Sequence, residues 1–141
     1  MDTSSEWIRA VEKDLAADSA RFKIEWVDIG PLGRWGTPLT FAGRKNFKAY
    51  ADSIWRHEEK PDLVLIDGRF RVACLFVSLL NADVGTRILF DDYLGRPKYH
   101  VVEEVLKPVR FCGRQALFVK ESEFDRDRLA EYAAEFMNVS G

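Results

Sequence analysis

The sequence has only two cysteines and none of the short motifs that mark several common enzyme chemistries. Cys74 and Cys112 lie in apolar stretches without CxxC spacing, which predicts buried free thiols in a reducing cytoplasm. No GxSxG, HExxH, Walker or GxGxxG motif occurs, so the sequence gives no support to nucleophilic hydrolysis or to P-loop chemistry.

Long hydrophobic runs and concentrated charge are also absent. The longest apolar runs are too short to cross a bilayer, and the N-terminal stretch MDTSSEWIRAVEKD lacks the apolar core of a signal peptide. The formal net charge is −2, and no basic tract or finger motif points to nucleic acid. These absences predict a cytoplasmic protein that binds neither a membrane nor a nucleic acid.

The composition that remains is typical of a globular domain, with 47% hydrophobic and 31% charged residues. A chain of 141 residues predicts a single domain over 1–141. Apolar runs predict strands, and apolar residues three and four positions apart predict amphipathic helices. Glycine and proline make IGPLGRWGTP (29–38) a loop. The predicted helices are 5–17, 44–58, 69–81, one beginning at Pro97, and 123–137, and the predicted strands are 22–29, 63–66, 86–90, 109–112 and 116–120.

This order of elements predicts an α/β fold. Strands that alternate with helices form a mostly parallel sheet through right-handed crossovers, with helices on both faces. The apolar run LVLI (63–66) predicts a strand buried on both faces. The last two strands flank Gly113-Arg114-Gln115, which predicts a C-terminal antiparallel hairpin. The expected fold class is therefore an open, Rossmann-like sheet.

Acidic residues follow three of the predicted strands: Asp28, Asp67 and the pair Asp91-Asp92. The carboxyl ends of parallel strands lie along one edge of a sheet, where open α/β folds bind ligands. Adjacent residues of an extended chain point to opposite sides, so only one of Asp91 and Asp92 is expected to face a given ligand. Two interpretations stay open: a set of carboxylates that faces a ligand, or separate caps of turns and helices.

Other polar residues near this edge are candidates for catalysis or substrate binding. His100, on the helix after the acidic pair, is a candidate acid or base, with a solvated helix residue as the alternative. Arg69 follows Asp67 closely and is expected to pair with it or to bind an acidic substrate. In the loop, Trp35 offers a flat surface and Arg34 a charge for a wall over the substrate. A structural turn is the alternative for that loop.

DIGPLGRWGTP and LIDGRFRVA resemble a bacterial group of methyltransferase-like proteins of unknown substrate. With TRILFDDY, the VVEEVL helix and the GRQALFV strand, the resemblance to class I S-adenosylmethionine-dependent methyltransferases covers the chain to about Val119. It implies methyl transfer to a small molecule. It also implies that Asp2 binds the cofactor ribose, and that Asp28 with Ile29 lies near the adenine. Asp67 and Asp92 would lie at the methyl-transfer site, with the candidate histidine.

The family's glycine-rich loop, which contacts the methionine part of the cofactor, has no counterpart in this sequence. In the family's sheet the first two strands lie between the third and the fourth, which correspond here to 22–29 and 63–66. We therefore expect an N-terminally truncated sheet that either closes this gap or forms a homodimer at the exposed edge. The missing loop argues against full activity of this chain.

Two further functions stay open beside methyl transfer of this kind. In a metal-assisted O-methyltransferase, Asp67 and Asp91, with or without Asp92, would hold Mg²⁺ against a catechol-like diol. In a non-catalytic module, a degenerate methyltransferase fold would serve protein association. Binding of S-adenosylmethionine separates the enzymes from the module, and magnesium dependence separates the two enzymes.

Overall fold

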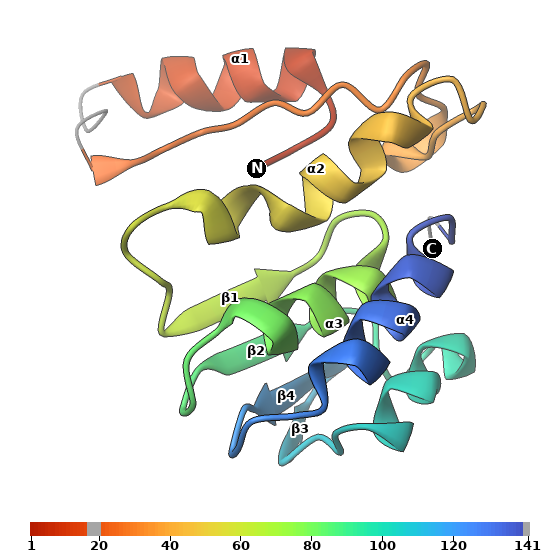
Figure 1. Cartoon of the computed structure of the whole chain (residues 1–141). Helices are drawn as coiled ribbons and strands as arrows, with labels where there is room; N and C mark the ends of the chain where they lie inside the picture. Colours follow the sequence, from red (N-terminus) through yellow and green to blue (C-terminus); the bar gives the residue numbers. More distant parts are fainter. Residues whose placement is uncertain (17–20, 140–141) are drawn as a thin grey trace. The chain divides into compact units, whose positions relative to one another are not determined.

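The computed structural model describes residues 1–16 and 21–139 of the chain (Figure 1). These residues form two compact units, Met1–Ile54 and Trp55–Gly141. The expectation of one domain over 1–141 stays a prediction. In the part of the chain that the structure describes, no helix is long and apolar enough to cross a membrane.

The first unit begins with α1 (Ser5–Asp14), where the sequence predicts a helix over 5–17. The hydroxyl of Ser4 accepts a hydrogen bond from the Trp7 backbone N–H at 3.2 Å, which satisfies one of the free donors at the helix start. The helix ends three residues early, and residue 17 lies outside the described residues.

The predicted strand 22–29 is wrong. Its described residues form one isolated parallel bridge, between Asp2 and Trp26. The Asp2 N–H donates to the Glu25 carbonyl at 3.0 Å, and the Val27 N–H donates to the Asp2 carbonyl at 3.1 Å. The partner segment turns into α1 directly after these bonds, so the ladder is too short to count as a strand.

The rest of the first unit is built from short helices. The predicted loop 29–38 holds a 3₁₀ turn, η2 (Arg34–Gly36), and an isolated bridge between Leu32 and Pro38. The predicted helix 44–58 is divided into three short pieces, of which the last crosses into the second unit. They are η3 (Arg44–Asn46), α2 (Phe47–Asp52) and η4 (Ser53–Arg56).

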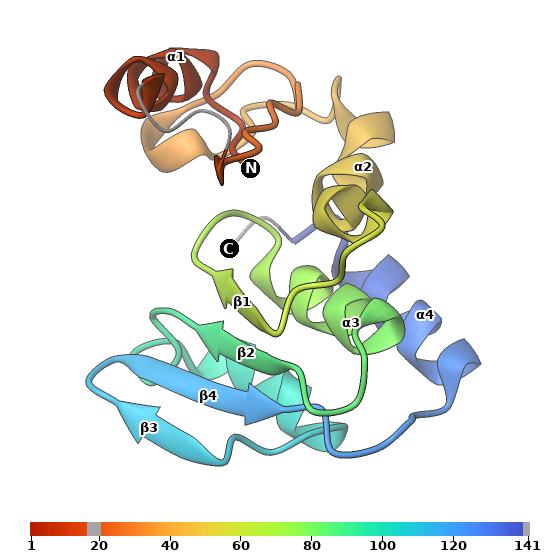
Figure 2. The same ribbon diagram turned by 90° about the vertical axis from the view of Figure 1, so that its left-hand side faces the viewer.

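The second unit contains a four-stranded sheet in the order β1-β2-β4-β3 (Figure 2). Among these strands only β1 and β2 are parallel, and the other two pairs are antiparallel. The expected mostly parallel sheet is therefore confirmed only in part, since one of the three described strand pairs is parallel. The crossover through α3 makes one parallel pair, whereas the hairpin places β4 against β2 in the opposite sense. The strands are β1 (Leu63–Ile66), β2 (Arg87–Phe90), β3 (Arg110–Cys112) and β4 (Gln115–Val119).

The helices of this unit are α3 (Arg71–Asn81), the 3₁₀ helix η5 (Pro97–Glu104) and α4 (Arg126–Phe136). Helices α3 and α4 pack together on one side of the sheet (Figures 1 and 2), where helices on both faces were expected. The rings of Phe76 and Tyr132 stack between them, with centroids 4.9 Å apart. The sheet residues on the buried face are Val64, Ile66, Ile88, Phe90, Ala116 and Phe118.

Strand β1 is not buried on both faces, contrary to the expectation from its continuous apolar run. Val64 and Ile66 face the core, but Leu63 and Leu65 are 54% and 60% exposed. The strand is at the end of the sheet, and no described residue of 22–29 belongs to that sheet. Hydropathy alone therefore overestimated the burial of β1.

Both cysteines are free thiols, as the spacing predicts, but they are not both buried. Cys74 is half-buried in α3, while Cys112 is exposed at the end of β3. Strand β3 lies at the other end of the sheet, so the apolar character of its sequence again does not bring burial.

Candidate functional site

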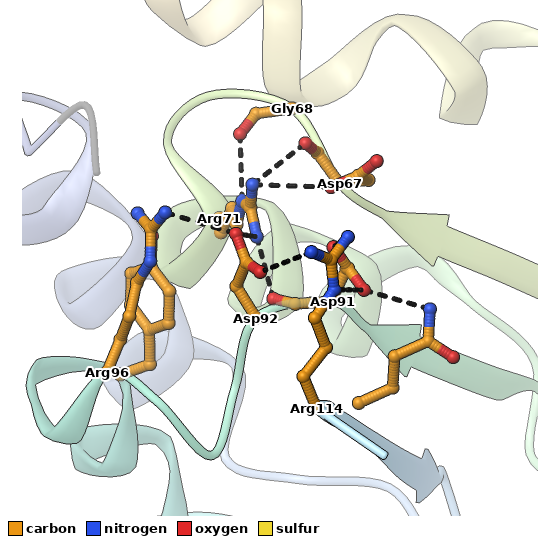
Figure 3. Close-up of polar contacts among 9 residues, drawn as sticks. Asp67, Gly68, Arg71, Asp91, Asp92, Arg96 and Arg114 are labelled. Atoms are coloured by element: carbon orange, nitrogen blue, oxygen red, sulfur yellow. Dashed lines mark hydrogen bonds and ion pairs between the residues drawn. The ribbon is translucent and has the colours of Figure 1, made fainter. Parts of the chain in front are cut away.

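The carboxyl ends of β1 and β2 lie side by side because the two strands are parallel and in register, with Ile66 opposite Phe90. Asp67 follows β1 directly, and Asp91 and Asp92 follow β2. The Asp91 backbone N–H donates to the Ile66 carbonyl at 3.0 Å, which extends the ladder by one bond. The structure thus brings the three carboxyl groups to one edge of the sheet, which we call the acidic edge (Figure 3).

Asp91 is the buried member of the acidic edge, at 2% exposure. Its Oδ1 accepts hydrogen bonds from Arg114 Nε at 3.1 Å and Gln115 Nε2 at 2.9 Å, and its Oδ2 accepts one from Arg114 Nη2 at 2.7 Å. Burial alone raises the pKa of the Asp91 carboxyl, but hydrogen bonds from Gln115, Arg114 and Asp67 together lower it. Asp91 therefore keeps its negative charge.

The pKa of the Asp67 carboxyl is shifted in the opposite direction, although Asp67 lies beside Asp91. Desolvation, a hydrogen bond to Asp91 and the negative charge of Asp91 raise the pKa of the Asp67 carboxyl, with a smaller opposing effect from Arg71. The side chain is nevertheless 56% exposed. The carboxyl with the raised pKa is thus Asp67, the member of the pair that a ligand can reach.

Asp92 is held by three guanidinium groups. Its carboxylate lies 3.3 Å from Arg71 Nη1, 3.1 Å from Arg96 Nη2 and 3.3 Å from Arg114 Nη1 (Figure 3). The residue has a φ of +56°, a left-handed conformation, so the chain is not extended here. The expectation that Asp91 and Asp92 point to opposite sides is therefore wrong, since Arg114 contacts both carboxylates.

This set of contacts does not fit the magnesium site considered from the sequence. The oxygens of Asp91 and Asp92 already accept hydrogen bonds from guanidinium and amide donors, which a cation would have to displace. Among residues 1–16 and 21–139, no group of three or more histidine, cysteine, aspartate or glutamate side chains is placed to hold a metal ion.

His100 contacts Tyr93 rather than the carboxylates of the acidic edge. The two rings stack with centroids 4.8 Å apart, and His100 Nε2 lies 3.3 Å from the Tyr93 backbone oxygen. Tyr93 is itself fully buried and donates to Glu103 at 2.8 Å. Burial and this hydrogen bond raise the pKa of the Tyr93 hydroxyl. The ring of His100 thus has a packing role in η5, and its catalytic role stays a prediction.

The predicted cofactor residues belong to the first unit. A parallel bridge pairs Asp2 with Trp26. The segment at Asp2 and the segment that leads to Asp28 therefore run side by side in the same direction. Asp2 Oδ1 accepts the Ser4 N–H at 2.7 Å, and Asp28 Oδ1 accepts the Gly30 N–H at 2.8 Å. Each carboxylate therefore caps a local turn through one oxygen, which for Asp28 is the alternative interpretation given in the sequence analysis.

The segment after Asp28 is held firmly. Ile29 is fully buried, and Asn46 donates from Nδ2 to the Asp28 carbonyl at 2.6 Å. Gly43 passes so close that a Cβ there would lie 2.1 Å from the Ile29 carbonyl carbon, so only glycine fits this crossing.

The loop residues Arg34 and Trp35 contact each other. The Arg34 guanidinium lies 5.1 Å from the Trp35 ring centroid, and Trp35 is 76% exposed. Its φ of +62° is left-handed, which is uncommon for a bulky residue. The flat aromatic surface expected from the sequence is thus available to a ligand, and substrate binding by this pair stays a prediction.

A comparison with solved structures finds a methyltransferase-like protein from Silicibacter pomeroyi with a TM-score of 0.79. The two chains are 34% identical, and the match covers 96% of this chain and 73% of that chain. The chain belongs to the methyltransferase-like proteins. No protein-family model matches the sequence, and no curated protein matches it. The match confirms the resemblance noted in the sequence and the mixed α/β fold.

The acidic edge of this chain also contains four polar residues that were not predicted from the sequence as binding residues. They are Arg71, Arg96, Arg114 and Gln115. A local signal existed for two of them, because Asp67 and Arg71, like Asp92 and Arg96, are four residues apart. For Arg114 and Gln115 no local signal exists, since the pairing of β2 with β4 brings them to Asp91. Arg69, the predicted partner of Asp67, is half-buried just before α3.

Proposed function

We propose that the chain is a cytoplasmic, S-adenosylmethionine-dependent methyltransferase-like protein that acts on a small molecule. The observation that carries this proposal is the Asp67–Asp91 carboxyl pair at the carboxyl ends of two parallel strands, in a chain of the methyltransferase-like family. Ligands of open α/β folds bind at this position. The two free cysteines fit a reducing compartment.

Asp67 is the proposed base. When bound, the cofactor supplies an electrophilic methyl group to an acceptor oxygen or nitrogen. Asp67 would take the proton of the acceptor as the acceptor bonds to the methyl carbon and the carbon–sulfur bond of the cofactor breaks, with the sulfur keeping the electrons of that bond. The raised pKa of Asp67 makes it a better proton acceptor than an ordinary carboxylate. Asp92 is proposed to orient the edge rather than to take the proton, because three guanidinium groups occupy its oxygens.

Asp2 and Asp28 are the proposed cofactor-binding residues of the first unit. Ribose hydroxyls donate hydrogen bonds that an ionised carboxylate accepts, and both residues engage only Oδ1 in the turns described above. Ile29 is fully buried beside Asp28 and gives the segment a fixed backbone. The residues present thus fit a ribose and its base, while the glycine-rich loop that contacts the methionine part in the family has no counterpart in this sequence.

Asp2→Asn is expected to weaken binding of S-adenosylmethionine about tenfold or more, because a charge-assisted hydrogen bond contributes roughly 1.5 to 3 kcal/mol. Asparagine keeps the oxygen that accepts the Ser4 N–H, so α1 retains its start. Titration calorimetry measures the affinity. Asp14→Asn is the matched control, since Asp14 is exposed at the end of the same helix.

Equal affinities of the wild-type chain and Asp2→Asn would contradict the proposed role of Asp2. A wild-type chain that binds no S-adenosylmethionine at all would contradict the proposed function and favour the alternative of protein association.

One observation favours that alternative function, a protein-association module that forms a homodimer. Strand β1 lies at the end of the described sheet and exposes Leu63 and Leu65. A strand at the end of a sheet presents unpaired backbone groups, and apolar side chains beside them favour pairing with a second copy.

In this alternative, Leu65→Lys is expected to convert the dimer to a monomer, because a lysine on the free strand opposes edge-to-edge pairing. Size-exclusion chromatography with light scattering over a range of concentrations measures the mass. Leu94→Lys is the control, since Leu94 is a comparably exposed leucine outside the strands. A wild-type chain that is monomeric at every concentration would eliminate the homodimer.

A further inference from the structure

Arg71 is the first residue of α3, and its side chain is only 4% exposed. It lies between the ends of β1 and β2, next to two residues in the left-handed conformation. Phe70 (φ +53°) precedes it in the chain, and Asp92 (φ +56°) contacts its guanidinium. Residues other than glycine adopt this conformation at an energetic cost, so the surrounding contacts must hold both loops in place.

On the β1 side, the guanidinium binds the turn that follows the strand. Nε donates to the Gly68 carbonyl at 3.0 Å, and Nη2 donates to the Asp67 carbonyl at 3.0 Å. Nη2 also lies 3.3 Å from Asp67 Oδ1. Both the backbone and the carboxyl of Asp67 are thus fixed by one side chain (Figure 3).

On the β2 side, the same guanidinium binds the residues that follow that strand. Nη1 donates to the Asp91 carbonyl at 2.7 Å and lies 3.3 Å from Asp92 Oδ2. A guanidinium has five N–H donors in a rigid plane, and these five contacts can engage all of them. A lysine at this position has three donors on one nitrogen and cannot reach both turns in this way.

We propose that Arg71 is the positioning residue of the acidic edge, which ties the ends of β1 and β2 together and holds Asp67 beside Asp91 for proton transfer. Its part in methyl transfer rests on the proposed function, whereas its control of Asp67 does not. The buried guanidinium acts through Asp67 and needs no contact with the acceptor. The charged groups that act on Asp67 are Asp91, Arg71 and Asp92, and Asp67 in turn acts on Arg114.

The test compares Arg71→Lys and Arg71→Gln in the full chain. Carbon-13 NMR of the aspartate carboxyls follows the titration of Asp67. Arg71→Gln is expected to raise the pKa of Asp67 further, because the charge that lowers it is lost. Arg71→Lys is expected to shift the same titration despite its charge, because the planar contacts are lost. If the chain transfers methyl groups, kcat is expected to fall about tenfold in Arg71→Lys.

Arg96→Gln is the matched control. Arg96 contacts Asp92 and the Tyr99 hydroxyl but makes no recorded contact with Asp67 in the described chain, so the Asp67 titration is expected to stay unchanged. An unchanged Asp67 titration in Arg71→Lys, which retains the charge and is the less disruptive variant, would overturn the proposal. If Asp67 shifts as expected but the wild-type chain neither binds the cofactor nor transfers a methyl group, only the proposed function fails.

Discussion

Asp67→Asn is expected to lower methyl transfer about a hundredfold or more, while it stabilises the fold at neutral pH. The loss of activity follows from the proposed role of Asp67 as the base, since a positioned acid or base contributes roughly 10²- to 10⁴-fold. The gain in stability follows from its environment, in which burial and the charge of Asp91 disfavour the ionised form. Initial rates with S-adenosylmethionine and thermal unfolding measure the two effects.

The stability effect of this substitution has a defined pH dependence. The folded chain binds the proton of Asp67 more tightly than the unfolded chain, whose carboxyl titrates near 3.8. The Asp67 contribution therefore destabilises the fold progressively as the pH rises through the folded pKa, and it is constant above that pH. The stability difference between Asp67→Asn and the wild-type chain is thus expected at pH 7 and is expected to shrink below about pH 4.

Asp62→Asn serves as the control, because Asp62 is an exposed aspartate at the opposite end of the same strand. We expect it to change neither rate nor stability appreciably. Retention of the wild-type rate by Asp67→Asn would remove Asp67 as the base, and a lower melting temperature at pH 7 would contradict the unfavourable charge assigned to it.

Asp91→Asn is expected to destabilise the fold by about 2 to 4 kcal/mol, because it breaks a buried, charge-assisted network. Both carboxylate oxygens of Asp91 accept hydrogen bonds, from Arg114 and from Gln115. An amide in the same place turns one acceptor into a donor that faces other donors. Urea denaturation measures the free energy of unfolding.

The same substitution is expected to lower the pKa of Asp67, because the negative charge beside it is lost while desolvation remains. Asp92→Asn is the comparison, since Asp92 has three guanidinium partners but a side chain that is 21% exposed. Water can replace lost hydrogen bonds at an exposed group, so Asp92→Asn is expected to lower the free energy of unfolding less than Asp91→Asn does. A cost for Asp91→Asn no greater than that for Asp92→Asn would contradict the network described for Asp91.

The pKa of Asp91 is lowered, so its contribution to stability has the opposite sign to that of Asp67. It is present above the ordinary pKa of an aspartate and is lost as the pH falls through the folded pKa. As the pH falls, the contribution of Asp91 to the free energy of unfolding is lost, whereas the destabilising contribution of Asp67 is relieved. This opposition follows from geometry, because Arg114 and Gln115 donate hydrogen bonds to Asp91, whereas Asp67 is desolvated and lies beside the negative charge of Asp91.

Local patterns were sufficient for the elements nearest the site. The apolar run 63–66 is β1 as predicted, and the helix predicted over 69–81 is α3, which begins at Arg71. The hairpin around Gly113 is also confirmed, with β3 and β4 on either side. In each case the signal lies within a few residues, since hydrophobic runs and turn residues act on their immediate neighbours.

Local patterns did not predict correctly the elements whose formation or burial depends on contacts with other segments of the chain. The segment 22–29 alternates like a strand, but a strand forms only where a neighbour continues the ladder, and α1 begins directly after Asp2. The long helix predicted over 44–58 is three short helical pieces, although its apolar spacing is helical. Strand β1 looks buried on both faces by hydropathy, yet only one face of it is covered.

The succession of strands and helices in the second unit follows from local sequence patterns, and so does the position of Asp67 and Asp92 after the strands whose ends form the site. The sequence also carried the resemblance that the structural match confirms. The contacts that hold the acidic edge together, in contrast, depend on how distant segments pair. Arg114 is 23 residues from Asp91, and the antiparallel pairing of β2 with β4 brings the two together. Hydrogen bonds between residues so far apart depend on strand order, which local sequence patterns do not encode.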